Sequence, residues 1–266
     1  MNYERIKLDF TDHVAVLTLN HPEALNAVSY QMVRELLDAI TRLGKAESGA
    51  RCLLMTGAGR GFCSGANLAD PERDATADKD ERDAGKVLEQ YYTPLLLGLR
   101  DLKMPIVTAV NGAAAGVGMS FALMGDLVLA ARSAYFLQAF RRIGLVPDGG
   151  ATYLLPRLIG RARAMELSLL GERLPAQTAL EWGMINRVYD DGELMPEALK
   201  LAKELALGPT VSLQLIRKLY WNSWENSYVE QLLLERVLQR EAGLTEDSVE
   251  GVTAFFQKRP AQFKGR

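Results

Sequence analysis

Residues 104–125 read MPIVTAVNGAAAGVGMSFALMG, a run of 22 positions without a charged side chain. The run is long enough to cross a membrane, but it contains Pro105, Asn111, Ser120, four glycines and few large aliphatic side chains. A membrane-spanning helix needs a more hydrophobic sequence than this. We therefore interpret the run as a buried, tightly packed segment, in which a strand at 106–110 leads into a glycine-rich loop, and we expect no membrane association.

Short apolar runs at 14–19, 52–56 and 127–130 resemble the run at 106–110. They are bounded by Asn, Gly or charged residues, as buried strands are. Two stretches between them, 29–43 and 88–102, place apolar residues three or four positions apart, which is typical of amphipathic helices. Strands that alternate with helices predict an α/β domain.

The sequence after Gly208-Pro209 predicts a largely helical region. Ser227–Glu230 and Asp247–Glu250 both have the pattern of a helix-starting capping box. The helix after Ser227 has more apolar surface than an isolated terminal helix should carry, at Leu232, Leu233, Leu234, Val237 and Leu238. Such a face needs the core or another subunit to cover it. We predict a core at 1–207 and a helical oligomerisation region at 208–266.

Composition excludes several classes of protein. The formal net charge is −2 in 266 residues, so nothing favours nucleic-acid binding. The two cysteines are too few for a disulfide framework, and residues 1–9 have no apolar signal-peptide region, so we expect a cytoplasmic protein. The two histidines, His13 and His21, both lie near the start, which argues against a histidine-rich metal site.

Two glycine-rich segments, 56–68 and 111–122, each follow an apolar strand. Neither fits a dinucleotide-binding fingerprint, since Phe62 and Phe121 stand where the third glycine belongs. The sequence around Ser120 is one residue from a nucleophile elbow, but no histidine follows it as a serine hydrolase requires. The exposed backbone N–H groups of both loops could stabilise one oxyanion. Alternatively, the small residues only permit close packing.

Asp148 is the carboxylate with the most apolar sequence neighbours, namely Ile143, Leu145, Val146 and Pro147. Apolar surroundings raise the pKa of a carboxyl group and allow proton exchange near neutrality. The alternative is a helix N-cap or turn residue, and the residues themselves leave both open. The stretch 70–86 has 11 charges in 17 residues, which fits a solvated loop or a lid beside a ligand site.

Taken together, these segments resemble the enoyl-CoA hydratase/isomerase (crotonase) superfamily over nearly the whole chain. The resemblance implies a spiral of ββα units followed by a helical trimerisation region, in trimers or hexamers. It also implies an acyl-CoA substrate, no further cofactor and no metal. The enolate oxygen would lie between the backbone N–H groups of Ser64 and Val117. The matching segments are 21–27, 59–68, 111–118, Asp126, 144–150, 160–165, 179–183 and 251–259.

The chain departs from the hydratase pattern at both catalytic glutamates, where it has Ser120 and Phe140. Asp148 remains, at a position where isomerases of the family place their acid/base. The pattern is most similar to the 1,2-epoxyphenylacetyl-CoA isomerase type of phenylacetate degradation. It predicts an enzyme that shifts a double bond or opens a ring epoxide, in phenylacetate or fatty acid metabolism. The alternatives are a hydratase, hydrolase or decarboxylase with a non-standard base, or a non-catalytic acyl-CoA binding protein.

The resemblance also implies where CoA binds. The pantetheine would pass Ala24 and Leu25 and then Ala66, Asn67 and Leu68. Phe255 and Lys258 would approach the adenine end, often from a neighbouring subunit. Residues 251–266 carry four basic side chains and no acidic one, which suits the CoA phosphates but is also typical of a solvated basic terminus.

Overall fold

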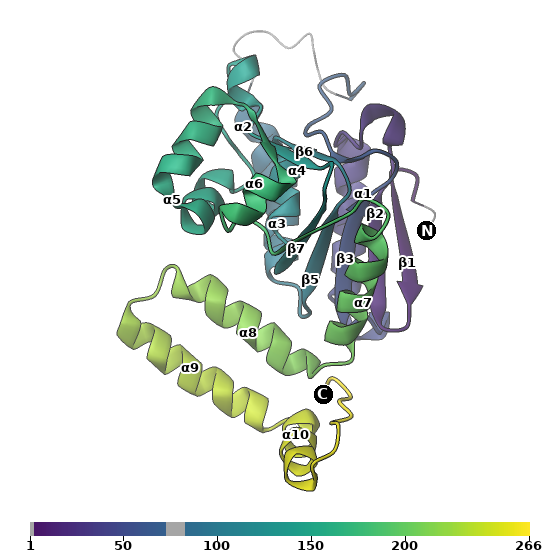
Figure 1. Cartoon of the computed structure of the whole chain (residues 1–266), viewed down its shortest axis with the longest axis vertical. Coiled ribbons are helices and arrows are strands. Elements are labelled where there is room, and N and C mark those ends of the chain that lie inside the picture. Colours follow the sequence, from purple (N-terminus) through teal and green to yellow (C-terminus); the bar gives the residue numbers. More distant parts are fainter. Residues whose placement is uncertain (1–2, 73–82) are drawn as a thin grey trace.

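The computed structural model describes residues 3–72 and 83–266, and its core is built on two sheets (Figure 1). In the larger sheet β1 and β2 are antiparallel, and every later neighbour pair is parallel. Its strand order is β1 (Ile6–Thr11), β2 (Val14–Leu19), β3 (Cys52–Gly57), β5 (Ile106–Val110), β7 (Leu127–Ala131) and β10 (Arg187–Tyr189).

The smaller sheet consists of strands of only three residues. Its order is β4 (Gly61–Cys63), β6 (Ala113–Ala115), β8 (Tyr135–Leu137) and β9 (Arg173–Pro175). The pairs β3–β4, β5–β6 and β7–β8 each place one strand in each sheet, and a helical segment follows each pair. This repeat is the spiral of ββα units that the sequence motifs predict.

The helical segments after these pairs differ in length. After β4 come α2 (Ala84–Val87), a π-helical turn (Leu88–Tyr92) and α3 (Thr93–Arg100). The short α4 (Val117–Ala122) follows β6, and the long α5 (Ala151–Leu170) follows β8 after the 3-10 turn η5 (Phe140–Ile143). The remaining core elements are η1 (Pro22–Ala24), α1 (Tyr30–Leu43), η2 (Ala46–Ser48), α6 (Ala176–Glu181) and α7 (Leu194–Ala206).

The predicted strands and helices of the core are confirmed. Every residue of β5 and of α4 is buried, so the uncharged run at 104–125 lies in the interior. Ser29 caps α1 by accepting a hydrogen bond from the Met32 N–H group at 3.1 Å. Within the described part of the chain, no helix combines the length and the apolar character that crossing a bilayer requires.

Three helices, α8 (Thr210–Ser223), α9 (Tyr228–Gly243) and α10 (Glu246–Gln257), extend away from the two sheets (Figure 1). The buried Arg217 of α8 attaches them to the core: its Nε lies 2.6 Å from the Asp126 carboxylate, and its other nitrogens donate to the carbonyls of Leu99 and Leu102. Arg51 binds the start of the region, donating to Thr210 Oγ1 at 2.7 Å and to the Gly208 carbonyl. The division at residue 207 stays a prediction.

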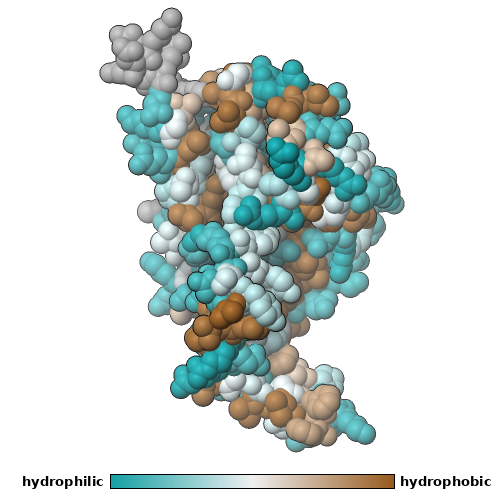
Figure 2. Space-filling model, turned by 90° about the vertical axis from the view of Figure 1, so that its left-hand side faces the viewer, coloured by the Kyte–Doolittle hydropathy of each residue, from teal (hydrophilic) through white to brown (hydrophobic). Residues whose placement is uncertain are grey.

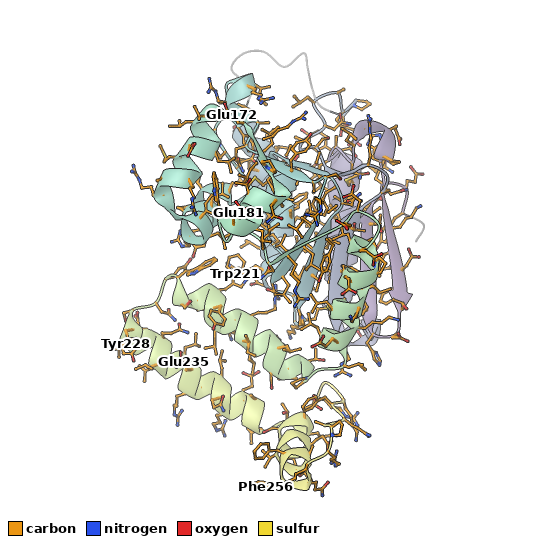
Figure 3. All side chains as sticks on the ribbon, viewed as in Figure 1. Glu172, Glu181, Trp221, Tyr228, Glu235 and Phe256 are labelled. Carbon is orange, nitrogen blue, oxygen red and sulfur yellow. The ribbon has the colours of Figure 1, made fainter. Side chains whose placement is uncertain are left out.

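The outer faces of these helices are apolar and exposed (Figure 2). On α9 only Leu238 is buried. Tyr228 and Phe256 lie on the side away from the core (Figure 3), whereas Trp221 packs against the core. The exposed large apolar residues of the region include Ile216, Tyr220, Tyr228, Val229, Leu232, Leu233, Val237, Leu244, Val249, Val252, Phe255 and Phe256.

One of the two predicted capping boxes is confirmed. Ser227 and Glu230 exchange both hydrogen bonds at the start of α9. The prediction at Asp247 is wrong, because α10 begins at Glu246 and its cap is Thr245, two residues before Asp247. Asp247 instead accepts hydrogen bonds from the N–H groups of Lys264 and Gly265 at 2.6 and 2.8 Å. The basic C-terminal residues therefore fold back onto α10.

Candidate active site

The two glycine-rich loops meet at Gly65 and Gly116. A Cβ atom on Gly65, whose φ is +103°, would lie 3.0 Å from the Ala115 carbonyl oxygen and 3.8 Å from the Gly116 Cα. A Cβ atom on Gly118 would lie only 2.3 Å from the Cys63 carbonyl oxygen. Only glycine permits this close approach. The small residues thus allow close packing, and the same packing brings the two loops together.

The structure corrects the first of the two predicted oxyanion donors. The Ser64 N–H group already donates to the Leu25 carbonyl at 3.0 Å, so it is not available to a ligand. The Ser64 hydroxyl is also used, donating to the Ala24 carbonyl at 3.1 Å. Ser64 therefore holds the 24–25 turn against the first glycine-rich loop.

The N–H group of Ala66, two residues further on, has a different environment. Ala66 forms a parallel bridge with Val28 through its neighbours: Val28 donates to the Gly65 carbonyl and Asn67 donates to the Val28 carbonyl. In such a bridge the N–H group of the central residue faces away from the partner strand. Within the described residues no backbone or side-chain acceptor takes the Ala66 N–H group.

The second predicted donor, Val117, is the first residue of α4. The first N–H groups of an α-helix have no partner inside the helix, and they carry the positive end of its dipole. Gly116 precedes Val117 with φ +53° and forms no capping side-chain bond. The N–H groups of Ala66 and Val117, neither of which has an acceptor in the described part of the chain, thus flank the contact between Gly65 and Gly116. Two such N–H groups could both donate to one oxyanion.

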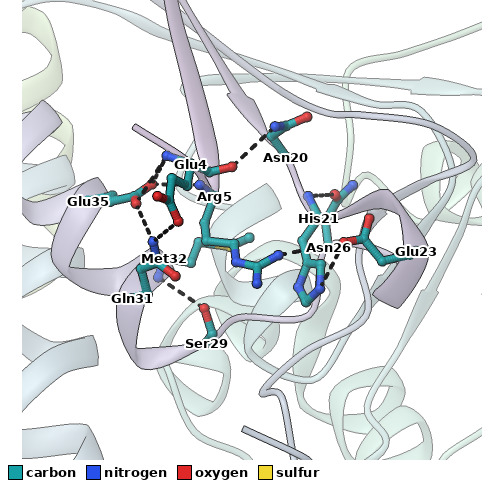
Figure 4. A network of polar contacts seen from close by, with 10 residues as sticks. All are labelled: Glu4, Arg5, Asn20, His21, Glu23, Asn26, Ser29, Gln31, Met32 and Glu35. Carbon is teal, nitrogen blue, oxygen red and sulfur yellow. Dashed lines mark hydrogen bonds and ion pairs between the residues drawn. The ribbon is translucent and has the colours of Figure 1, made fainter. Parts of the chain in front are cut away.

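Asn26 fixes the neighbouring turn at 21–26, where Leu25 and Asn26 both have positive φ (Figure 4). The fully buried Asn26 side chain accepts from the His21 N–H group at 2.8 Å. It donates to the carbonyls of Ala58 and Gly61 at 2.9 and 2.8 Å. The turn carrying Ala24 and Leu25 is therefore rigidly attached to the first glycine-rich loop.

Asp148 lies in the loop between η5 and α5, and its side chain does not cap the helix. The capping position of α5 is Gly150, and no side chain bonds there. The Asp148 Oδ1 atom is buried and has no hydrogen-bond partner within the described residues. Burial raises the pKa of the Asp148 carboxyl to about 6. The N-cap alternative is therefore wrong, whereas Asp148 does begin a turn, because its carbonyl accepts from the Ala151 N–H group at 3.1 Å. A pKa of about 6 suits a proton-exchanging acid.

Asp148 is close to the second oxyanion donor through its neighbour Gly149. A Cβ atom on Gly149 would lie 3.1 Å from Val117 Cγ2 and 2.9 Å from both Cβ and Oγ of Ser120. The two residues that replace the hydratase glutamates are buried here as well. Ser120 supports the loop, and the Phe140 ring lies 3.7 Å from where a Cβ of Gly116 would be. Neither side chain can serve as a carboxylate base.

The remaining predicted contacts are accessible but untested. Ala66 and Leu68 are exposed, and Asn67 between them is half-buried. Phe255 and Lys258 are exposed on and just after α10, which lies at the opposite end of the molecule from α4 (Figure 1). Residues 73–82, most of the hypothetical lid, lie outside the described residues. Among the described residues, no three His, Cys, Asp or Glu side chains gather to hold a metal ion.

Comparison with known proteins identifies the family of the chain. Residues 9–266 match the enoyl-CoA hydratase/isomerase family. The 1,2-epoxyphenylacetyl-CoA isomerase of Escherichia coli is 48% identical over 95% of each chain, and a probable enoyl-CoA hydratase of Rhodobacter capsulatus is 40% identical over both full lengths. The crystal structure of an enoyl-CoA hydratase from Bacillus anthracis superposes with a TM-score of 0.89 at 29% identity, covering 99% of this chain and 100% of that one. The chain therefore belongs to the enoyl-CoA hydratase/isomerase family, the crotonase superfamily of enzymes, as its sequence motifs predict.

Proposed function

We propose that the protein is an acyl-CoA isomerase with Asp148 as its single acid/base and the N–H groups of Ala66 and Val117 as its oxyanion hole. One observation carries the proposal: Asp148, whose pKa is about 6 and whose buried Oδ1 atom has no partner among the described residues, directly precedes Gly149, which packs against Val117. Ser120 and Phe140 occupy the two glutamate positions. The E. coli relative, named an isomerase, supports it.

The proposed reaction needs only these groups. The thioester oxygen accepts hydrogen bonds from the two N–H groups, which stabilise negative charge as it develops. The Asp148 carboxylate removes a proton from one carbon, and the electron pair moves onto the thioester oxygen to give an enolate. The Asp148 carboxylic acid then returns the proton two carbons away, and the double bond moves between them. A pKa of about 6 suits both steps, because the group is ionised at neutral pH and still donates readily.

A ring epoxide would use the same groups. The oxyanion hole would hold the thioester oxygen, and Asp148 would move a proton from the carbon next to the thioester to the ring. The C–C bond between the two epoxide carbons would open to give a seven-membered oxygen-containing ring, in which both C–O bonds are kept. The substrate of the E. coli relative, according to its name, is such an acyl-CoA. We therefore include a ring-derived acyl-CoA among the substrates to be tested.

Hydration is the second candidate, favoured by the R. capsulatus relative that is named a probable enoyl-CoA hydratase. Adding water across a double bond requires one group to activate the water and a source for the second proton. The Ser120 hydroxyl is committed to the Asp148 carbonyl, and Phe140 cannot transfer a proton. Asp148 would have to perform both steps, so the geometry supports isomerisation better.

The test is to assay both reactions on one purified sample. A 3-enoyl-CoA reports isomerisation by the absorbance of the conjugated product, and a 2-enoyl-CoA reports hydration by the mass gain of one water. A ring-epoxide acyl-CoA is assayed by loss of substrate and the mass of the product. Isomerisation that Asp148→Asn abolishes supports the proposal. Hydration without isomerisation would favour the hydratase alternative over the proposal. Turnover of none of the three substrates would favour the alternative of an acyl-CoA binding protein.

The proposal extends to the subunit arrangement. Phe255 lies on α10 and Lys258 just after it, and α10 is at the other end of the molecule from α4 and α5 (Figure 1). If these residues hold the adenine end of CoA, they serve the site of a neighbouring subunit. The exposed apolar faces of α9 and α10 would then be covered by the other subunits of a trimer or hexamer.

A further inference from the structure

Ser120 has no exposed surface, although it occupies a position where hydratases of the family carry a catalytic glutamate. Its hydroxyl donates a hydrogen bond to the backbone carbonyl of Asp148 at 3.1 Å. The side chain therefore does not reach the space where a substrate would bind. It is a contact between α4 and the loop that carries Asp148.

The backbone that follows Asp148 rests on the same side chain. Gly149 has φ +60°, and a Cβ atom there would lie 2.9 Å from both Cβ and Oγ of Ser120. The same atom would lie 3.1 Å from Val117 Cγ2. A glycine at 149 and a small residue at 120 thus let the loop approach α4 closely, next to the oxyanion donor Val117.

The side chain of Asp148 does not hold itself in place. Its Oδ1 atom has no hydrogen-bond partner among the described residues, so its position is set by its backbone. The Asp148 carbonyl accepts two hydrogen bonds, from the Ala151 N–H group at 3.1 Å and from Ser120. The Ala151 bond is local to the start of α5, whereas the Ser120 bond joins the loop to the helix that begins with Val117.

We propose that Ser120 is a positioning residue, which fixes the distance between the Asp148 carboxylate and the oxyanion hole by tying the Asp148 loop to α4. The inference rests on the proposed isomerase function. Ser120, at the position of a catalytic glutamate that this chain lacks, would thus hold the remaining carboxylate, Asp148, in place. Because proton transfer requires its partners within hydrogen-bond reach, a loosened loop would slow the reaction without weakening binding of the CoA moiety.

The experiment compares Ser120→Ala with Ser168→Ala, a control that makes the same change at a half-buried serine near the end of α5. For both variants and the wild type we would measure kcat, KM and the pH profile with a 3-enoyl-CoA. Amide hydrogen exchange of a peptide covering residues 144–152 is measured in the absence of substrate. This second readout does not depend on activity.

For Ser120→Ala we expect kcat to fall about 10-fold or more, with KM changed less than about 2-fold. The acid side of the pH profile should move to lower pH, because a loosened loop lets water reach the carboxyl and lowers its pKa. Exchange in 144–152 should be several-fold faster, since a tertiary hydrogen bond of the loop is lost. Ser168→Ala should show none of these changes.

Three results would overturn the inference. Unchanged exchange in Ser120→Ala would show that the hydroxyl does not hold the loop. Faster exchange with unchanged kcat and pH profile would show that the contact is merely structural. A fall in kcat that Ser168→Ala shares would show a general effect of the substitution. If the wild type moves no double bond, the proposed function fails, and the exchange data alone decide whether Ser120 holds the loop.

Discussion

Asp148→Asn should separate a proton-exchanging role from a structural one, because the two roles change activity and stability in opposite ways. Asparagine keeps the size of the side chain but can neither accept nor return a proton at neutral pH. Removing a general acid/base costs about 100-fold or more in rate. We therefore expect kcat/KM to fall at least about 100-fold in Asp148→Asn. In the wild type, kcat/KM should increase with pH and reach half of its maximum near pH 6, because burial raises the pKa of this carboxyl to about 6.

The same substitution should not destabilise the fold at neutral pH. Burial raises the pKa of Asp148 from 3.8 to about 6, so the folded state binds this proton more tightly than the unfolded state does. Ionisation of Asp148 therefore lowers the free energy of unfolding. The loss is absent below about pH 4, grows between about pH 4 and pH 6, and is constant at higher pH. The shift corresponds to at most about 3 kcal/mol, which we reduce to about 1 kcal/mol because the residue is partly exposed to solvent.

Asparagine avoids this cost, so Asp148→Asn should be about 1 kcal/mol more stable than the wild type at pH 7.5, or roughly 2 °C higher in Tm. The difference should vanish near pH 4. Thermal unfolding at both pH values measures it, and Asp9→Asn, at an exposed position on β1, is the matched control in which neither activity nor stability should change. A variant that loses stability at pH 7.5 and keeps its activity would refute the reasoning.

Three further predictions concern the rest of the molecule. Lys258→Ala should raise KM for acyl-CoA several-fold at nearly constant kcat, and less so for a pantetheine thioester that lacks the CoA phosphates; equal effects on both substrates would exclude contact with those phosphates. Light scattering at micromolar concentration should give about three or six times the chain mass of 29.3 kDa, and a value near one chain mass would contradict the proposed oligomer. Arg217→Met should lower the free energy of unfolding by about 3 kcal/mol, because it leaves the Asp126 carboxylate without its buried partner; urea unfolding without a change in midpoint would contradict this.

The four central strands of the larger sheet could be predicted from the sequence, but its edge strands β1 and β10 and the smaller sheet were not. Strands β2, β3 and β5 are apolar runs of five or six residues with clear polar boundaries, long enough to show a pattern. Strands of the smaller sheet, such as β4 and β6, have only three residues and lie inside the glycine-rich segments. Three residues carry no periodicity, and their pairing depends on contacts between distant turns of the spiral.

The chemistry of Asp148 was predictable in its direction but not in its setting. Its apolar sequence neighbours indicated a raised pKa, and the structure agrees, although Val146 itself is 78% exposed. The burial of the carboxyl comes instead from a loop that packs on α4, as the contact between Gly149 and Ser120 shows. That contact joins residues far apart in the sequence, so no local pattern could reveal it.

The proposed oxyanion donor in the first loop was also difficult to predict from the sequence. A backbone N–H group can serve whatever side chain its residue carries, so the residue type does not reveal it. The resemblance assigned this donor to Ser64 and placed Ala66 on the path of the pantetheine, although both residues flank the glycine at 65. The choice between them depends on long-range pairing: Leu25 takes the Ser64 N–H group, and Val28 pairs with the groups on either side of Ala66. The sequence does predict that the two glycine-rich loops approach each other closely, because glycine permits such contacts. Which amide remains free is decided by the 24–28 segment, which no ligand-binding motif in the loop itself specifies.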